Sequence, residues 1–119
     1  MFINEEHEKR YKRLKSKSRC NHSEFNSFMY IIAGNEQLYN KVNSIYNFKE
    51  NKLNLSFNDE GEPYLGDLWL SSSESALLRL GIQMYNNGTK QNVFDTFYSL
   101  DEYNCVLAIN CIKIRFNIK

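Results

Sequence analysis

The sequence contains no long apolar run. No stretch approaches the roughly 20 apolar residues that a bilayer-spanning helix needs, and the first residues, MFINEEHEKRYKR, are charged where a secretory signal peptide is apolar. The three cysteines, Cys20, Cys105 and Cys111, are odd in number and lack the spacing of a disulfide framework. We therefore expect a cytoplasmic protein with free thiols.

Glycine and histidine are too sparse for the usual phosphate-binding and metal-binding motifs. Gly61 and Gly66 are isolated, and neither belongs to a GxGxxG or GK[ST] phosphate loop. Cys20 and His22 form a Cys-x-His pair, which supplies only two of the four ligands that a structural zinc site requires. We expect no metal and no cofactor.

Nucleophilic residues are present without the flanking motifs of a catalytic centre. A Cys–His nucleophile is open on residue types alone, because the chain has two histidines and three cysteines. Ser71 could also be a nucleophile, but Ser71 followed by Glu74 matches a capping box at the start of a helix. We favour the cap and do not expect an enzyme, which leaves a hydrolase as a distant alternative.

The composition predicts one folded domain. Hydrophobic residues make up 42% of the 119 residues and aromatic residues 14%, and no linker-like stretch divides residues 1–119. The apolar spacing indicates a mainly α fold, a compact bundle of about five to six helices with a small β-hairpin insertion at residues 51–70. The expected helices are about 5–17, 23–34, 36–46, 71–86, a short one opened by Asn92, and 102–116.

Two of these segments carry more specific expectations. The helix at 102–116 is apolar nearly all round, which predicts the central position in the core. In the hairpin, Leu53, Leu55 and Phe57 alternate with polar residues before a dense turn signal. Residues 64–70 then form either its second strand or a loop.

Positive charge is concentrated in the first helix, whereas residues 20–119 carry eight basic and eleven acidic residues. This helix could contact phosphates or an acidic protein surface, with Tyr11 stacking on a base, or it could be a solvated face balanced by Glu5, Glu6 and Glu8. Its second half has no acidic residue, so its charge should be less neutralised there. The basic candidates for partner binding are Lys9, Arg10, Lys12, Arg13, Lys15, Lys17 and Arg19.

The single tryptophan, Trp69, stands just before the predicted cap at Ser71. Two interpretations are open, a packing contact onto the following helix or an exposed anchor for a partner. Packing is the favoured one, and Trp69 is kept as a candidate binding residue.

Four segments in this order, MFINEEHEKRY, MYIIAGNEQLYNKVNSIYNF, LLRLGIQMYNNG and FYSLDEYNCVLAINCIKIRF, run through most of the chain. In them the chain resembles a family of small uncharacterised proteins of low-GC Gram-positive bacteria and their phages and mobile elements. The resemblance brings no catalytic residues. It implies an accessory protein that binds a host protein or ribonucleoprotein and inhibits it, for example a CRISPR-type defence nuclease. The alternative is a nucleic-acid-binding module that uses the basic helix.

Overall fold

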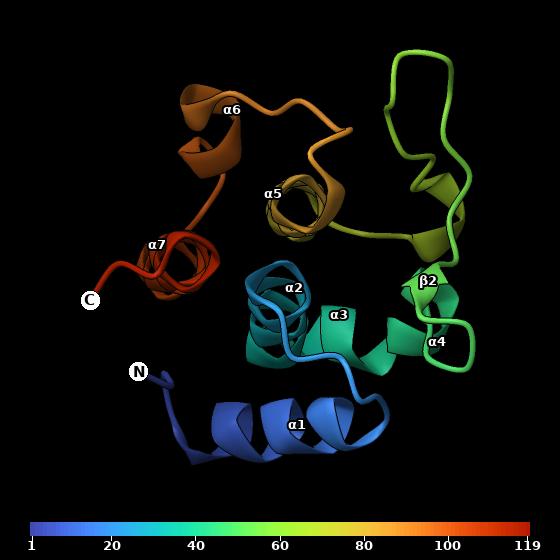
Figure 1. Ribbon diagram of the computed structural model, residues 1–119. Helices are drawn as coiled ribbons and strands as arrows, with labels where there is room; N and C mark the ends of the chain where they lie inside the picture. Colours follow the sequence, from blue (N-terminus) through green and yellow to red (C-terminus); the bar gives the residue numbers. More distant parts are fainter.

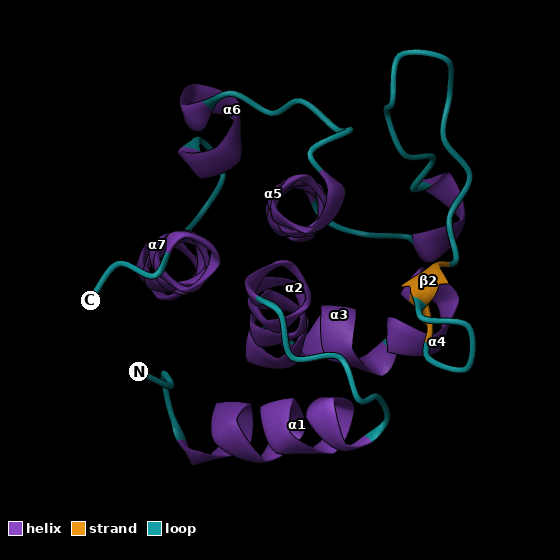
Figure 2. Cartoon of the chain, viewed as in Figure 1, coloured by secondary structure: helices purple, strands orange, loops and turns teal.

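The computed structural model describes residues 1–119, and its elements fall close to the predicted segments. In chain order they are α1 (Glu5–Ser16), α2 (Ser23–Gly34), α3 (Glu36–Asn40), α4 (Val42–Ile45), β1 (Tyr46–Asn47), β2 (Lys52–Leu53), the 3₁₀ helix η1 (Gly66–Leu68), α5 (Ser72–Asn86), α6 (Val93–Phe97) and α7 (Glu102–Phe116). The mainly α fold with one small antiparallel hairpin is therefore confirmed (Figure 2). The expected helix at 36–46 is divided at Lys41 into α3 and α4.

Side-chain caps fix where the longer helices begin. Asn4 and Asp101 each accept the backbone N–H of the residue three positions later, at 2.8 and 2.9 Å. Ser71 and Glu74 form the reciprocal capping box that the sequence predicts. At α2 the cap is the side chain of His22 rather than the following serine. None of these helices has the length and apolar character needed to cross a membrane.

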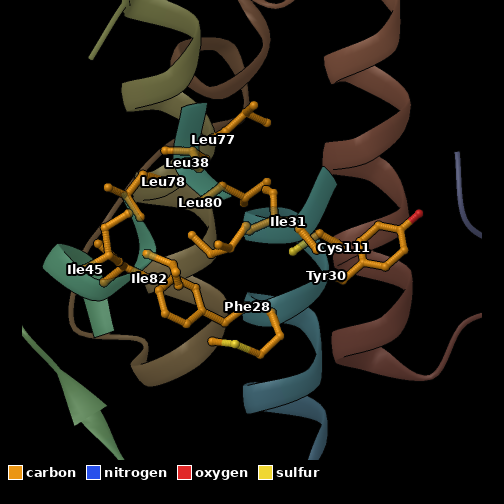
Figure 3. Close-up of a cluster of buried hydrophobic side chains, with 14 of the residues drawn as sticks. Phe28, Tyr30, Ile31, Leu38, Ile45, Leu77, Leu78, Leu80, Ile82 and Cys111 are labelled. Atoms are coloured by element: carbon orange, nitrogen blue, oxygen red, sulfur yellow. The ribbon is translucent and has the colours of Figure 1, made fainter. Parts of the chain in front are cut away.

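The centre of the core is α2. This helix packs against α1, α5 and α7, which surround it in Figure 1. It is buried from Ser27 to Gly34, as a helix must be when its neighbours cover every face. Figure 3 shows Phe28 and Ile31 of α2 among leucines of α5, with Cys111 of α7 on the other side.

The prediction that α7 is the central helix is wrong. Only one side of α7 is buried, through Asn104, Leu107, Ala108 and Cys111. Ile109 lies on the opposite side and is 45% exposed. Both α2 and α7 are apolar nearly all round, and the sequence cannot rank them because their burial depends on which neighbours pack around each helix.

Close contact between α2 and α5 requires glycine at position 81. A Cβ atom there would lie 2.8 Å from a methyl group of Ile31 and 2.9 Å from the ring of Phe28. Such distances are shorter than real Cβ contacts, so any larger residue would push α5 away from α2. Gly81 thus sets the spacing of the two helices that form most of the core.

The hairpin forms earlier in the chain than predicted. Tyr46 pairs with Leu53, and Asn47 pairs with Lys52. After β2, the rest of 51–70 contains only one isolated bridge, between Phe57 and Pro63 across the predicted turn. Residues 64–70 form η1 and a loop instead of a strand, because Leu68 turns inward and is buried in the core.

Candidate interaction surfaces

The apolar side of α1 packs as the sequence predicts, with His7 and Leu14 buried. Tyr11 is half-buried between two other rings, with ring centroids 5.3 Å from Phe2 and 6.4 Å from Tyr30. These contacts make Tyr11 a packing residue. Its predicted role in stacking on a base has no support in this arrangement.

Two of the basic candidates are neutralised by carboxylates. The guanidinium of Arg10 lies 3.6 Å from Glu6 and 3.9 Å from Glu36 of α3. The ammonium of Lys12 lies 3.0 Å from Glu8, one turn earlier on α1. The expectation that charge is less neutralised in the second half of the helix is therefore wrong for Lys12, because a side chain reaches back over a full turn.

Lys15 has a structural role. Its Nζ atom donates to the carbonyl oxygen of Cys20 at 3.0 Å and to Oδ1 of Asn21 at 3.1 Å, and it also bonds the side chain of Asn26. Partial burial lowers the pKa of Lys15. These bonds close the connection between α1 and α2, so Lys15 is not available to a partner.

Three of the remaining cations share one face of α1. Lys9 and Arg13 of α1 and Lys17, the residue that ends the helix as its C-cap, are spaced by four residues, which places them in a row. None lies within ion-pair distance of a carboxylate. We call these three residues the basic stripe. Arg19 is also exposed and unpaired, but it lies beyond the end of the helix.

The basic stripe ends at an open groove of about 540 Å³ between α1 and the hairpin. The ammonium of Lys17 lies 5.3 Å from the ring centroid of Phe48, a cation–π contact. No acidic residue lines the groove. Its lining residues are Lys17, Asn43, Tyr46, Asn47, Phe48, Lys49 and Asn54.

Trp69 does not pack, so the favoured interpretation from the sequence is wrong. Its side chain is 87% exposed, and its backbone is left-handed, with φ 54° and ψ 49°. Lys41 holds this backbone, because its Nζ atom donates to the carbonyl oxygens of Leu68 at 2.6 Å and of Trp69 at 3.3 Å. Leu70, the next residue, packs against the core in its place.

A further exposed apolar cluster lies on α6 and was missed by the sequence reasoning. Phe94 and Tyr98 are 70% and 77% exposed, and their ring centroids are 5.2 Å apart. Val93 beside them is also exposed, whereas Phe97 packs against the core. No local signal in the sequence marks this exposure, because positions 93, 94, 97 and 98 fall within an arc of about 140° on a helix, which is the pattern of a packing face.

The nucleophile and metal candidates have structural positions. Ser71 is occupied in the capping box, and His22 caps α2. Cys111 is buried, its thiol lies 3.3 Å from the carbonyl oxygen of Ser27, and burial raises the pKa of that thiol. Nowhere do three or more histidine, cysteine, aspartate or glutamate side chains gather as they would around a metal ion.

Comparison with known protein families matches the whole chain, residues 1–119, to one described as a family of unknown function, DUF6075. No curated protein and no solved structure matches the chain.

Proposed function

Since the chain belongs to the DUF6075 family, whose function is unknown, we propose from its own surface that it acts by binding another protein, with Trp69 as the anchor. The observation that carries this proposal is the 87% exposure of Trp69 on a left-handed backbone. A bulky aromatic residue in that backbone region costs about 1–3 kcal/mol and persists only where its surroundings impose it. A tryptophan that is both strained and exposed adds nothing to folding, which favours a role in binding.

The surroundings of Trp69 fix the position of its backbone. Lys41 binds the two carbonyl groups at the end of η1, and the capping box of α5 begins two residues after Trp69. On the other side of η1, the ring of Tyr64 covers Gly66, where a Cβ atom would lie 2.9 Å from the tyrosine oxygen. A partner pocket would thus receive a side chain whose backbone is already ordered, which reduces the entropic cost of binding.

The resemblance to proteins of phages and mobile elements also suggests what kind of partner is bound. In a phage or mobile element, the partner would be a host protein or ribonucleoprotein, and the protein would inhibit it by occupying its surface. A CRISPR-type nuclease complex is one such target. This part of the proposal rests on the resemblance alone.

The test compares Trp69→Gly with the parent protein. Glycine accepts a left-handed backbone without strain. We therefore expect the free energy of unfolding of this variant to be about 1 kcal/mol higher than that of the parent, with a correspondingly higher melting temperature. We expect the same variant to bind its partner at least about tenfold more weakly, because a buried tryptophan is typical of binding hot spots. Phe116→Ala removes another exposed aromatic residue, more than half exposed, and is the matched control.

The partner can be captured from cells of the source organism with tagged protein, before and after nuclease treatment. A protein partner survives that treatment. Because Trp69 is the only tryptophan, its emission in a complex with a tryptophan-free fragment of the partner should shift to shorter wavelength. Equal capture by the Trp69→Gly and parent proteins would contradict the proposal.

A second candidate function, nucleic-acid binding, is favoured by the basic stripe. Three cations in a row without a carboxylate partner resemble the contacts through which proteins bind a phosphate backbone. A triple change of Lys9, Arg13 and Lys17 to glutamine keeps the helix propensity and spares the structural Lys15. We expect this variant to fold normally and to bind nucleic acid much more weakly than the parent. The affinity that remains should depend less on salt concentration. Unchanged binding would leave the stripe as a solvated surface.

A further inference from the structure

We infer that the groove at the end of the basic stripe is a site for an unpaired nucleotide within a single-stranded nucleic acid. This inference rests on the second candidate function and specifies the ligand of that surface. The cations of the groove would contact the phosphate groups, and the asparagine side chains of the groove would contact the base edge.

The charges of the groove suit a phosphate. Lys17 comes from α1 and Lys49 from the turn between β1 and β2, and no carboxylate lines the space between them. The cation–π contact with Phe48 orients the ammonium of Lys17 without neutralising its charge. Two cations from segments far apart in the sequence therefore converge on one groove.

The asparagines of the groove retain hydrogen-bonding groups that no protein atom uses. The side chain of Asn43 makes no hydrogen bond within the protein. Asn47 uses only its oxygen, which accepts the N–H of Glu50 at 3.1 Å. Asn54 uses only its NH₂ group, which donates to the carbonyl oxygen of Asn43 at 3.2 Å. Both donors and acceptors remain, and this combination matches the edge of a nucleobase better than a purely anionic ligand.

The walls of the groove are fixed to each other. Oγ of Ser18, just after α1, donates to Oδ1 of Asn51 in the hairpin turn at 2.7 Å. The N–H of Asn54 donates to the carbonyl oxygen of Ile45 at 2.8 Å, which holds the strand after the turn against α4. The lysines and asparagines thus stand on a preformed surface, so little ordering is needed when a ligand binds.

The shape favours a single strand over a duplex. The asparagines line a hollow, and a base can enter a hollow only after it has left its stack. A duplex keeps its base edges inside its own grooves, where a protruding protein element must reach them. A strand bound along the basic stripe would place one nucleotide in the groove and its neighbouring phosphates on α1.

The experiment measures fluorescence anisotropy of labelled single strands of about 12 nucleotides, RNA and DNA, and of the matching duplex, over a range of salt. One variant combines Lys17→Gln with Lys49→Gln, and a second combines Asn43→Ala with Asn47→Ala. The control combines Lys12→Gln with Lys90→Gln, two cations that do not line the groove. The melting temperature of each variant shows that it is folded.

We expect the lysine variant to bind single strands more weakly and to reduce the slope of log affinity against log salt by about 0.7 for each phosphate group that it no longer binds. The asparagine variant should weaken binding by about fivefold or more and leave this slope unchanged. The control variant should have the same affinity for single strands and the same salt slope as the parent protein. Duplex should bind more weakly than single strand.

Four results would overturn the inference. The first two are a control variant that weakens binding as much as the lysine variant and a duplex that binds as tightly as a single strand. The third is a polyglutamate peptide that displaces the single strand as well as an unlabelled strand does. The fourth comes from a further double variant, Lys9→Gln with Arg13→Gln, and is a decrease in affinity seen in that variant alone. In the last case the basic stripe still binds nucleic acid and only the groove is excluded. If no strand bound more tightly than about 10⁻⁴ M, nucleic-acid binding itself would be excluded.

Discussion

His7 is a buried polar residue that ties the N-terminal segment to the core. Its Nδ1 atom accepts the N–H of Ile3 at 3.1 Å, and its Nε2 atom lies 2.9 Å from the carbonyl oxygen of Tyr30. These two partners require a neutral ring with the proton on Nε2. Burial lowers the pKa of His7 below its usual 6.5, despite the opposing effect of the Tyr30 carbonyl.

This pKa makes stability depend on pH in a definite direction. Below pH 6.5 the unfolded chain takes up a proton at His7 that the folded chain does not. The free energy of unfolding should therefore be highest above that pH and should fall as the pH decreases toward the lowered pKa. Urea denaturation between pH 7 and about pH 5 should show a smaller decrease for His7→Gln than for the parent. Equal decreases in both proteins would contradict this role of His7.

Two lysines on α1 carry the same charge and have different roles. Lys15 bonds three groups in the connection to α2, whereas Lys12 makes one exposed ion pair with Glu8. We predict that Lys15→Gln lowers the free energy of unfolding by about 1 kcal/mol and that Lys12→Gln changes it by less than about 0.5 kcal/mol. Chemical denaturation measures both. A larger decrease for Lys12→Gln would reverse this assignment.

The unequal burial of α2 and α7 predicts an unequal response to the same substitution. Ile31 of α2 is fully buried, so Ile31→Ala should destabilise the protein by about 2–5 kcal/mol. Ile109 of α7 is 45% exposed, and Ile109→Ala should change stability by about 0.5 kcal/mol or less. Melting curves of the two variants measure this difference. Similar destabilisation by both substitutions would contradict the peripheral position of α7.

The arrangement of the helices around α2 bears on the whole molecule. The helices α1, α5 and α7 all pack mainly on α2 (Figure 1). Loss of any one of them would expose part of the apolar surface of α2, so no subset of helices should be stable alone. We predict one unfolding transition, with far-ultraviolet circular dichroism and the near-ultraviolet tyrosine signal changing together. Two separate transitions would contradict the single-domain prediction for residues 1–119.

The sequence by itself determined the local structure. The caps at Asn4, Ser71 and Asp101 and the ends of the long helices were predictable, because these interactions join residues three or four positions apart. The one-sided burial of α1 also followed from its spacing, with His7 and Leu14 inside. Such features depend on backbone geometry that every helix shares.

Only the tertiary structure decided which surfaces are free. Arg10 is neutralised partly by Glu36 of α3, and Lys15 donates its hydrogen bonds to oxygen atoms in the connection to α2. The exposure of Trp69 depends on Lys41, which is 28 positions away in the chain. The groove likewise joins the end of α1 to residues 43–54. Burial and pairing of this kind arise from contacts between distant segments, and a local pattern carries no information about which distant segment will be the neighbour.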